Sequence, residues 1–271
     1  MDRPGKKGWV AGVCRRAGAL YGRRVSPQQR IHFTALLIIF SLAPVCRAGD
    51  VAFDPRITQQ QFHQFSSVVS QAIFPTPVEP ARGRGLLGFD IGIAATAIPV
   101  DEKAAYWVRS VDSSFLRSGY LTVPRLVASK GIGFANVAAS YAQISGTSIK
   151  LYGGSVDVPI IDGGLVSPTL AVRGSYSEIR GADVFSLKTY GAEAFLSKGF
   201  GPFTPYAAAG VTRFKALGRV QQGTINLDFS DTSDHNRFTV GVRFSLFVPK
   251  IVVEATQGAE RTYSAKISLG L

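Results

Sequence analysis

The chain of 271 residues is poor in cysteine and in charge. Both of its cysteines, Cys14 and Cys46, lie within the first 48 residues. Disulfides, thiolate metal sites and cysteine nucleophiles are therefore excluded from residue 49 onward. Charged residues make up only 18%, below the roughly 25% usual in soluble domains. This low charge, combined with the 29 glycines and the 11% of aromatic residues, argues against intrinsic disorder.

The excess of positive charge is confined to the N-terminal segment. The chain has a formal net charge of +12, but residues 1–48 hold nine basic residues and one acidic residue. The rest carries 21 basic and 17 acidic side chains, a net charge of +4. Nucleic-acid binding thereby loses its main support, and we expect no nucleic-acid partner.

Residues 1–48 have the pattern of an export signal. Basic residues precede an apolar run of 13 residues from Phe33 to Val45, and small residues around Ala48 suit cleavage after it. The run is shorter than the roughly 20 residues of a spanning helix, so a permanent anchor is the weaker alternative. The long basic extension suggests a translation start downstream of Met1, near Val25.

Residues 49–84 differ in pattern from the rest of the chain. Asp54 and Pro55 are typical of a helix start, and apolar residues at helical spacing predict an amphipathic helix over 56–73. Prolines from Pro75 to Pro80 then end it. We expect a periplasmic helix and proline-rich linker packed on the end of the domain; the alternative is a plug inside a barrel.

From residue 85 to 271 the hydrophobic period changes to two, which is typical of β-strands. In 237–248, for example, every second residue from Phe238 to Leu246 is apolar, and Arg237 and Arg243 lie on the other face. Ten such segments are predicted strands: 86–98, 120–129, 131–143, 147–158, 170–177, 184–198, 204–216, 237–248, 250–257 and 263–271. The segments 99–119 and 217–236 are the predicted long loops, the first with a possible short helix.

The charges on the polar face distinguish a membrane barrel from a soluble sandwich. Apolar and aromatic residues on one face suit lipid, whereas charges with glycine and serine on the other suit a wet or ion-paired lumen. The fold class is therefore all-β: a closed antiparallel transmembrane β-barrel of about 8–12 strands, with ten the best estimate, and one N-terminal amphipathic helix. The predicted lumen-lining residues are Asp90, Arg173, Glu193, Arg213, Arg243, Glu254 and Lys266.

The last strand resembles the assembly signal of small outer-membrane β-barrels of Gram-negative bacteria, the OmpA-like and porin-like barrels. It alternates apolar residues and carries an aromatic residue, although it ends in leucine rather than phenylalanine: Tyr263, Ile267, Leu269 and Leu271. Residues 198–211 are similar to the turn-and-strand runs common in these barrels. The resemblance covers roughly residues 85–271. It implies a cell outer membrane location and, as partners, outer-membrane lipid and the barrel-assembly machinery.

We expect no enzymatic activity, no cofactor and no metal. Ser233 and His235 share one polar segment, but a flexible loop lacks the third group that orients a catalytic base. Asp228, Asp231 and Asp234 could offer oxygen ligands to Ca²⁺, yet the glycine spacing of a calcium loop is missing.

The expected function follows from the polar face. Its basic residues outnumber its acidic ones, so an aqueous path would favour anions, whereas mutual pairing would close it. We predict a narrow channel or carrier for small or amphiphilic solutes. The first alternative is a non-conducting structural or adhesive barrel whose loops bind surface partners, and the second is a lipid-modifying barrel enzyme.

Overall fold

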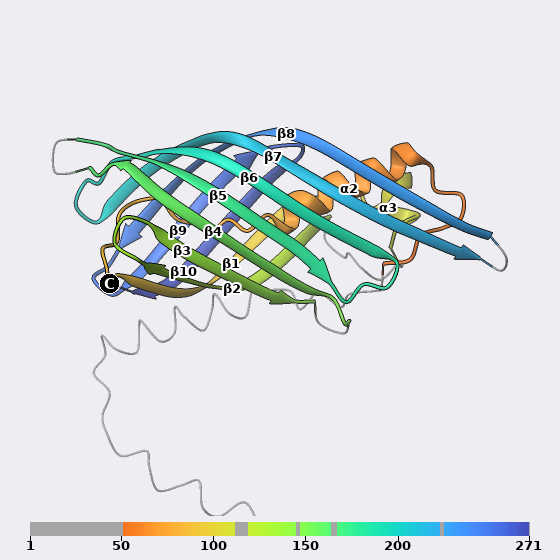
Figure 1. Ribbon diagram of the computed structural model, residues 1–271, viewed down its shortest axis with the longest axis horizontal. Helices are drawn as coiled ribbons and strands as arrows, with labels where there is room; N and C mark the ends of the chain where they lie inside the picture. The colour runs from red at the N-terminus through yellow and green to blue at the C-terminus, as the bar shows by residue number, and fades with distance from the viewer. Residues whose placement is uncertain (1–50, 112–118, 145–146, 164–166, 223–224, 271) are drawn as a thin grey trace, which may run out of the picture. The chain divides into compact units, whose positions relative to one another are not determined.

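A computed structural model describes residues 51–111, 119–144, 147–163, 167–222 and 225–270. Ten antiparallel strands close into a barrel in which each strand pairs with its neighbours in the chain and β1 pairs with β10 (Figure 1). The predicted signal segment and its cleavage site lie outside the described residues, as does Leu271. The predicted closed ten-stranded barrel is confirmed.

The strands differ in length around the barrel. Their bounds are β1 Phe89–Pro99, β2 Tyr120–Gly131, β3 Asn136–Gln143, β4 Lys150–Ile161, β5 Thr169–Arg180, β6 Phe185–Ser197, β7 Phe203–Gln222, β8 Ile225–Ser245, β9 Pro249–Gln257 and β10 Arg261–Gly270. Along most strands, buried and exposed residues alternate, so one face of the pleat points inward and the other outward.

The predicted loop over 217–236 is wrong, because residues 217–222 continue β7 and residues 225–236 belong to β8. The polar run of β8 is paired with β7 over its whole length, and opposite charges face each other across the two strands. Arg213 lies opposite Asp234 and Arg219 lies opposite Asp228, and both pairs are ion pairs. Such cross-strand pairs stabilise an otherwise polar hairpin.

Helix α2, Gln59–Ile73, begins three residues later than predicted. Thr58 caps it, and Thr58 and Gln61 form a reciprocal capping box. Asp54 instead accepts hydrogen bonds from Arg56, and these hydrogen bonds hold the pKa of the Asp54 carboxyl below its usual range. A second, short helix, α3 Ala105–Val108, lies between β1 and β2, where a short helix was predicted. Among the described residues, neither helix is long and apolar enough to cross a membrane.

Helix α2 lies inside the barrel. It contacts β1, β2, β5, β6, β7 and β8, which surround it (Figure 1). Its last eight residues are all buried, including Ser66, Ser70 and Gln71. A helix packed on the end of the barrel would expose one face, so the position corresponds to the plug alternative and not to the expected periplasmic helix.

The segment after α2 continues through the interior. Residues 74–81 are all buried, and the chain leaves the interior near Gly85, just before β1 begins. The prolines of this segment keep it extended, so it needs no helix or strand partner of its own. We call residues 53–84 the plug.

Candidate functional site: the occluded barrel interior

The centre of the interior is an ion-pair network around Glu79 of the plug. Lys266 of β10 lies between two carboxylates, with its Nζ 2.9 Å from Glu79 Oε2 and 2.9 Å from Asp90 Oδ1. Arg84 also pairs with Glu79, and Lys250 Nζ lies 3.2 Å from Asp90 Oδ2. The side chains of all five residues are charged and buried, so each has a desolvation cost that only its ion-pair partners offset. The plug and the barrel wall thus hold each other through this network.

A second cluster forms around Arg173 of β5. Its Nε and Nη2 donate to the two carboxylate oxygens of Asp157 at 2.6 and 2.9 Å. Nη2 also donates to the backbone carbonyl of Glu79 at 3.1 Å, and the guanidinium lies 4.2 Å from the ring centre of Phe195. One wall arginine therefore binds a wall carboxylate and the plug backbone together.

Two further arginines hold the plug where α2 ends. Arg125 of β2 donates to the carbonyl of Phe74 at 2.6 Å and to that of Ala72 at 3.0 Å. These are carbonyls at the helix C-terminus, which an arginine satisfies well. Arg237 of β8 pairs with Glu193 at 3.1 Å and places its guanidinium 4.1 Å from the ring centre of Phe74. Arg125 and Arg237 therefore both contact the turn of the plug around Phe74.

Further hydrogen bonds complete the contacts of the interior. Glu254 of β9 accepts a hydrogen bond from Thr76 of the plug at 3.1 Å and one from Tyr206 at 2.8 Å. Arg243 donates to Thr204 at 3.1 Å within the wall. Both carboxylate oxygens of the buried Glu254 therefore have a hydrogen-bond partner within the protein.

Six of the seven predicted lumen residues point into the interior. They are the buried residues Asp90, Arg173, Glu193, Arg243, Glu254 and Lys266. Arg213 points outward instead: its side chain is 59% exposed and pairs with the equally exposed Asp234. Phe214, the next residue of β7, is fully buried and packs against His63 of α2, so the alternation of the strand turns Arg213 outward.

Five further charged residues of the interior are not among the predicted lumen residues. Glu79 and Arg84 were read as part of a linker, and Asp157, Arg125 and Arg237 were not selected. The period-two pattern had placed Arg237 on the polar face, and the same alternation would have identified Asp157 and Arg125 as inward-facing. Glu79 and Arg84 could not have been found in this way, because a linker has no periodic pattern that shows which side chains point inward.

His235, considered for catalysis, and the three aspartates considered for calcium binding contact arginines of β7 or side chains of α2. Asp228 and Asp234 pair with arginines of β7, whereas Asp231 Oδ2 lies 2.8 Å from His63 Nδ1 of α2. His235 lies 3.2 Å from the hydroxyl of Ser67 of α2. The described residues contain no metal-ligating cluster of three or more such side chains. These contacts fasten α2 to β8.

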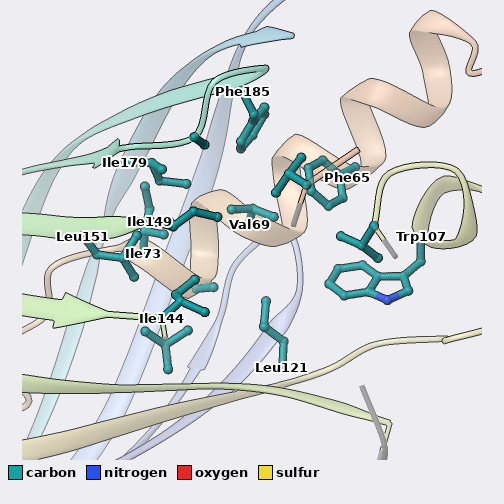
Figure 2. Close-up of a pocket in the computed structure, with 15 residues that line it drawn as sticks. Phe65, Val69, Ile73, Trp107, Leu121, Ile144, Ile149, Leu151, Ile179 and Phe185 are labelled. Carbon is teal, nitrogen blue, oxygen red and sulfur yellow. The ribbon is translucent and has the colours of Figure 1, made fainter. Parts of the chain in front are cut away.

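An apolar cavity of about 40 Å³ lies beside α2, near the end of the barrel that carries α3 (Figure 2). Figure 2 shows side chains from α2, from α3 and from strands on the wall converging on it. Its lining is entirely apolar; the labelled residues are Phe65, Val69, Ile73, Trp107, Leu121, Ile144, Ile149, Leu151, Ile179 and Phe185.

Close packing of the plug on the wall makes Gly191 of β6 sensitive to substitution. A Cβ at this position would lie 2.5 Å from the ring of Phe74. We expect Gly191→Val to lower the free energy of unfolding by about 1–3 kcal/mol, as overpacking does. Urea unfolding of the refolded protein measures it. Gly174→Val on the neighbouring strand is the matched control, because a Cβ at Gly174 would have no other atom within 4 Å. Equal unfolding free energies of the two variants would contradict the packing of Phe74 on Gly191.

Comparison with known proteins gives structural matches only. No family model matches, and no curated protein matches. The N-terminal barrel domain of OprF from Pseudomonas aeruginosa shares 12% identity, covering 67% of this chain and 97% of that one, with a TM-score of 0.31. The outer membrane protease OmpT from Escherichia coli shares 6% identity, with 68% and 95% coverage and a TM-score of 0.37.

A further match is the attachment protein Ail of Yersinia pestis, with 9% identity, 68% and 95% coverage and a TM-score of 0.29. Identities and TM-scores this low carry no activity over to this chain. The strand order itself establishes the fold. The chain is a closed ten-stranded antiparallel β-barrel.

Proposed function

We propose that the protein is an outer-membrane β-barrel whose interior is closed by its own N-terminal segment. The barrel does not conduct ions at rest, and it anchors a surface-exposed hairpin. The observation that carries this proposal is the occupied interior. Residues 74–81 are all buried, and wall side chains on β2, β5, β9 and β10 hydrogen bond with or ion-pair to the plug. An aqueous path would require these partners to separate.

The outward surface supports a membrane location. A protein in water rarely exposes a contiguous apolar band, whereas a membrane barrel requires one. Every strand from β1 to β10 exposes at least one apolar side chain on its outer face. Examples are Ile91, Leu126, Ala139, Val156, Val172, Leu196, Val211, Val240, Val253 and Leu269. Tyr263, Ile267 and Leu269 of the predicted assembly signal lie on the same outward register.

The two ends of the barrel differ in a way that supports an orientation. The connections β2–β3, β4–β5, β6–β7 and β8–β9 share one end and have three to seven residues, whereas the opposite end carries the 20-residue 100–119 connection and the long β7–β8 hairpin. Outer-membrane barrels have short periplasmic turns and longer outer loops. The α3 end would then face outward.

The β7–β8 hairpin is the feature best suited to contact a surface partner. Its strands have 20 and 21 residues, although about 9–11 tilted residues cross a bilayer. The excess residues include the exposed ion pairs Arg213–Asp234 and Arg219–Asp228. This favours the structural or adhesive role over the channel expected from composition.

Single-channel recording in planar bilayers tests the proposal. The full chain, shown to be folded by heat-modifiable gel mobility, should insert without producing conductance steps. Discrete anion-preferring steps that change with Arg243→Glu would contradict the closed barrel and restore the channel function.

A further inference from the structure

The barrel wall has an incomplete seam between β2 and β3. In the described residues, β2 pairs with β1 over all eleven positions of β1, from Phe89–Lys130 to Pro99–Tyr120. On its other side, β2 pairs with β3 at only six positions, and the register ends at Leu126–Tyr141. Among the described residues, the first six residues of β2, Tyr120–Arg125, therefore pair with β1 but with no strand on the β3 side.

The sequence gives a reason for the open seam. Pro124 lies two residues above the last pair and has no amide hydrogen to donate to a ladder. Proline within sheets occurs on edges, at first residues or at bulges. The seam is also bounded by the short strand β3, which ends at Gln143.

The apolar cavity lies directly behind this seam. Leu121 and Val123 of β2 line it from one side of the seam, and Ile144, Ile149 and Leu151 line it from the other (Figure 2). A smaller space of about 10 Å³ adjoins the seam itself and is lined by Val123, Ala142 and Leu151, among others. Arg125 also borders this space, but its guanidinium donates to the plug carbonyls.

We propose that the seam is a lateral port through which the end of a hydrocarbon chain enters the cavity from the surrounding bilayer. The cavity has no polar lining, so it holds no water stably and favours an apolar group. Its volume of about 40 Å³ exceeds severalfold the roughly 10–15 Å³ that one water-sized sphere needs. It therefore accommodates the terminal few carbons of a chain, while the polar head remains in the membrane.

The outer side of the seam lies in the apolar band that would contact lipid. An acyl chain of the bilayer is therefore the apolar group that can reach the cavity. Tyr120, Leu126 and Tyr152 are exposed on the outside of β2 and β4 next to it. The inference rests on the proposed membrane location but not on the absence of conductance. A diacyl lipid and a free fatty acid offer the same chain chemistry, and the test below separates them.

Fluorescence quenching of Trp107 tests the port. Trp107 lines the cavity, and the chain has one other tryptophan, Trp9, so Trp9→Phe in the full chain leaves a single reporter. The protein is inserted into phosphatidylcholine vesicles containing a fatty acid brominated either near its methyl end or beside its carboxylate. A second arm uses phosphatidylcholine brominated at the same two chain positions.

We expect bromine near the methyl end to quench Trp107 more strongly than bromine beside the carboxylate. Simple depth in the bilayer predicts the reverse for a residue near the outer end of the barrel. Quenching in the fatty-acid arm alone identifies a free acid as the occupant, and quenching in both arms identifies any acyl chain. Stronger quenching by the carboxylate-side bromine in both arms would overturn the proposal.

Two variants place the effect at the seam. Ala142→Phe fills the space behind it and should weaken the apparent affinity of the chain about tenfold, the effect of losing room for about two methylene groups. Ala139→Phe, on the outer face of the paired part of β3, is the matched control and should have no effect. Equal quenching in the two variants would overturn the port.

Pro124→Val provides a second route if Ala142→Phe does not fold. This substitution gives position 124 an amide hydrogen that can form a hydrogen bond across the seam and narrow it. The quenching of Trp107 should then begin more slowly, and an unchanged rate would contradict the port. Conductance is recorded on the same samples. An inserted, silent barrel without methyl-end quenching overturns the port alone, and a conducting barrel with such quenching overturns only the closed-barrel proposal.

Discussion

Glu79→Gln should open the barrel and destabilise it. The substitution keeps the shape of the side chain but removes the carboxylate that faces Lys266 and Arg84, leaving these cations with Asp90 as their shared anion. Breaking a buried pair from one side costs about 3–5 kcal/mol. We expect a loss of that size in the free energy of unfolding, measured in urea, and conductance steps in planar bilayers because the plug loses its central attachment.

Asp228→Asn is the matched control for this prediction. It makes the same acid-to-amide change, but in the exposed pair with Arg219 on the β7–β8 hairpin. Exposed pairs contribute about 0–1 kcal/mol, so stability should change little and the barrel should remain silent. If Glu79→Gln behaved like Asp228→Asn, the network would not hold the plug.

Phe65→Ala should produce the other large effect. Phe65 is 1% exposed and packs with ring-centre distances of 5.3 Å to Phe185, 5.7 Å to Phe53 and 5.8 Å to Trp107. Truncating a buried phenylalanine costs about 3–5 kcal/mol, because the contacts and the filled volume are lost together. Urea unfolding of the refolded variant should show this loss.

Phe134→Ala provides the comparison, because Phe134 is 77% exposed in the turn between β2 and β3. Its unfolding free energy should change by about 0.5 kcal/mol or less in detergent. Equal losses for the two variants would show that Phe65 is not inside a packed interior, as would unchanged stability of Phe65→Ala.

The barrel could be predicted because each strand carries its own evidence. In β8, Phe238 and Val240 alternate with Arg237 and Thr239, and the structure turns the first two outward and the other two inward. A period of two is a local property, so ten segments could be located without knowledge of their partners. The strand order then follows from pairing neighbours along the chain.

The position of the plug could not be predicted, because the helical pattern is the same in both locations. The spacing of Phe62, Phe65 and Val69 requires an apolar environment, and either the end or the interior of the barrel offers one. What decides between them is long-range: Arg125 binding the end of α2, and Lys266 binding Glu79. Neither contact leaves a local sequence signal.

The first, polar half of β8 was wrongly predicted to be a loop, also because long-range contacts decide its structure. Residues such as Asp228 and Asp234 have low strand propensity, so the segment resembles a loop when taken alone. Their opposite partners Arg219 and Arg213 stand on β7, and the register that joins them is set by the hairpin as a whole. The same register turns Arg213 away from the interior.

Photo-crosslinking from position 74 tests most directly whether the plug occupies the barrel. Phe74 is replaced by benzoylphenylalanine in the full chain, and the protein is irradiated in its membrane. The account predicts an internal crosslink to β6 near Gly191 or to β8 near Arg237, since these residues contact the Phe74 ring. Crosslinks to other proteins or to lipid, with none to β6 or β8, would contradict it.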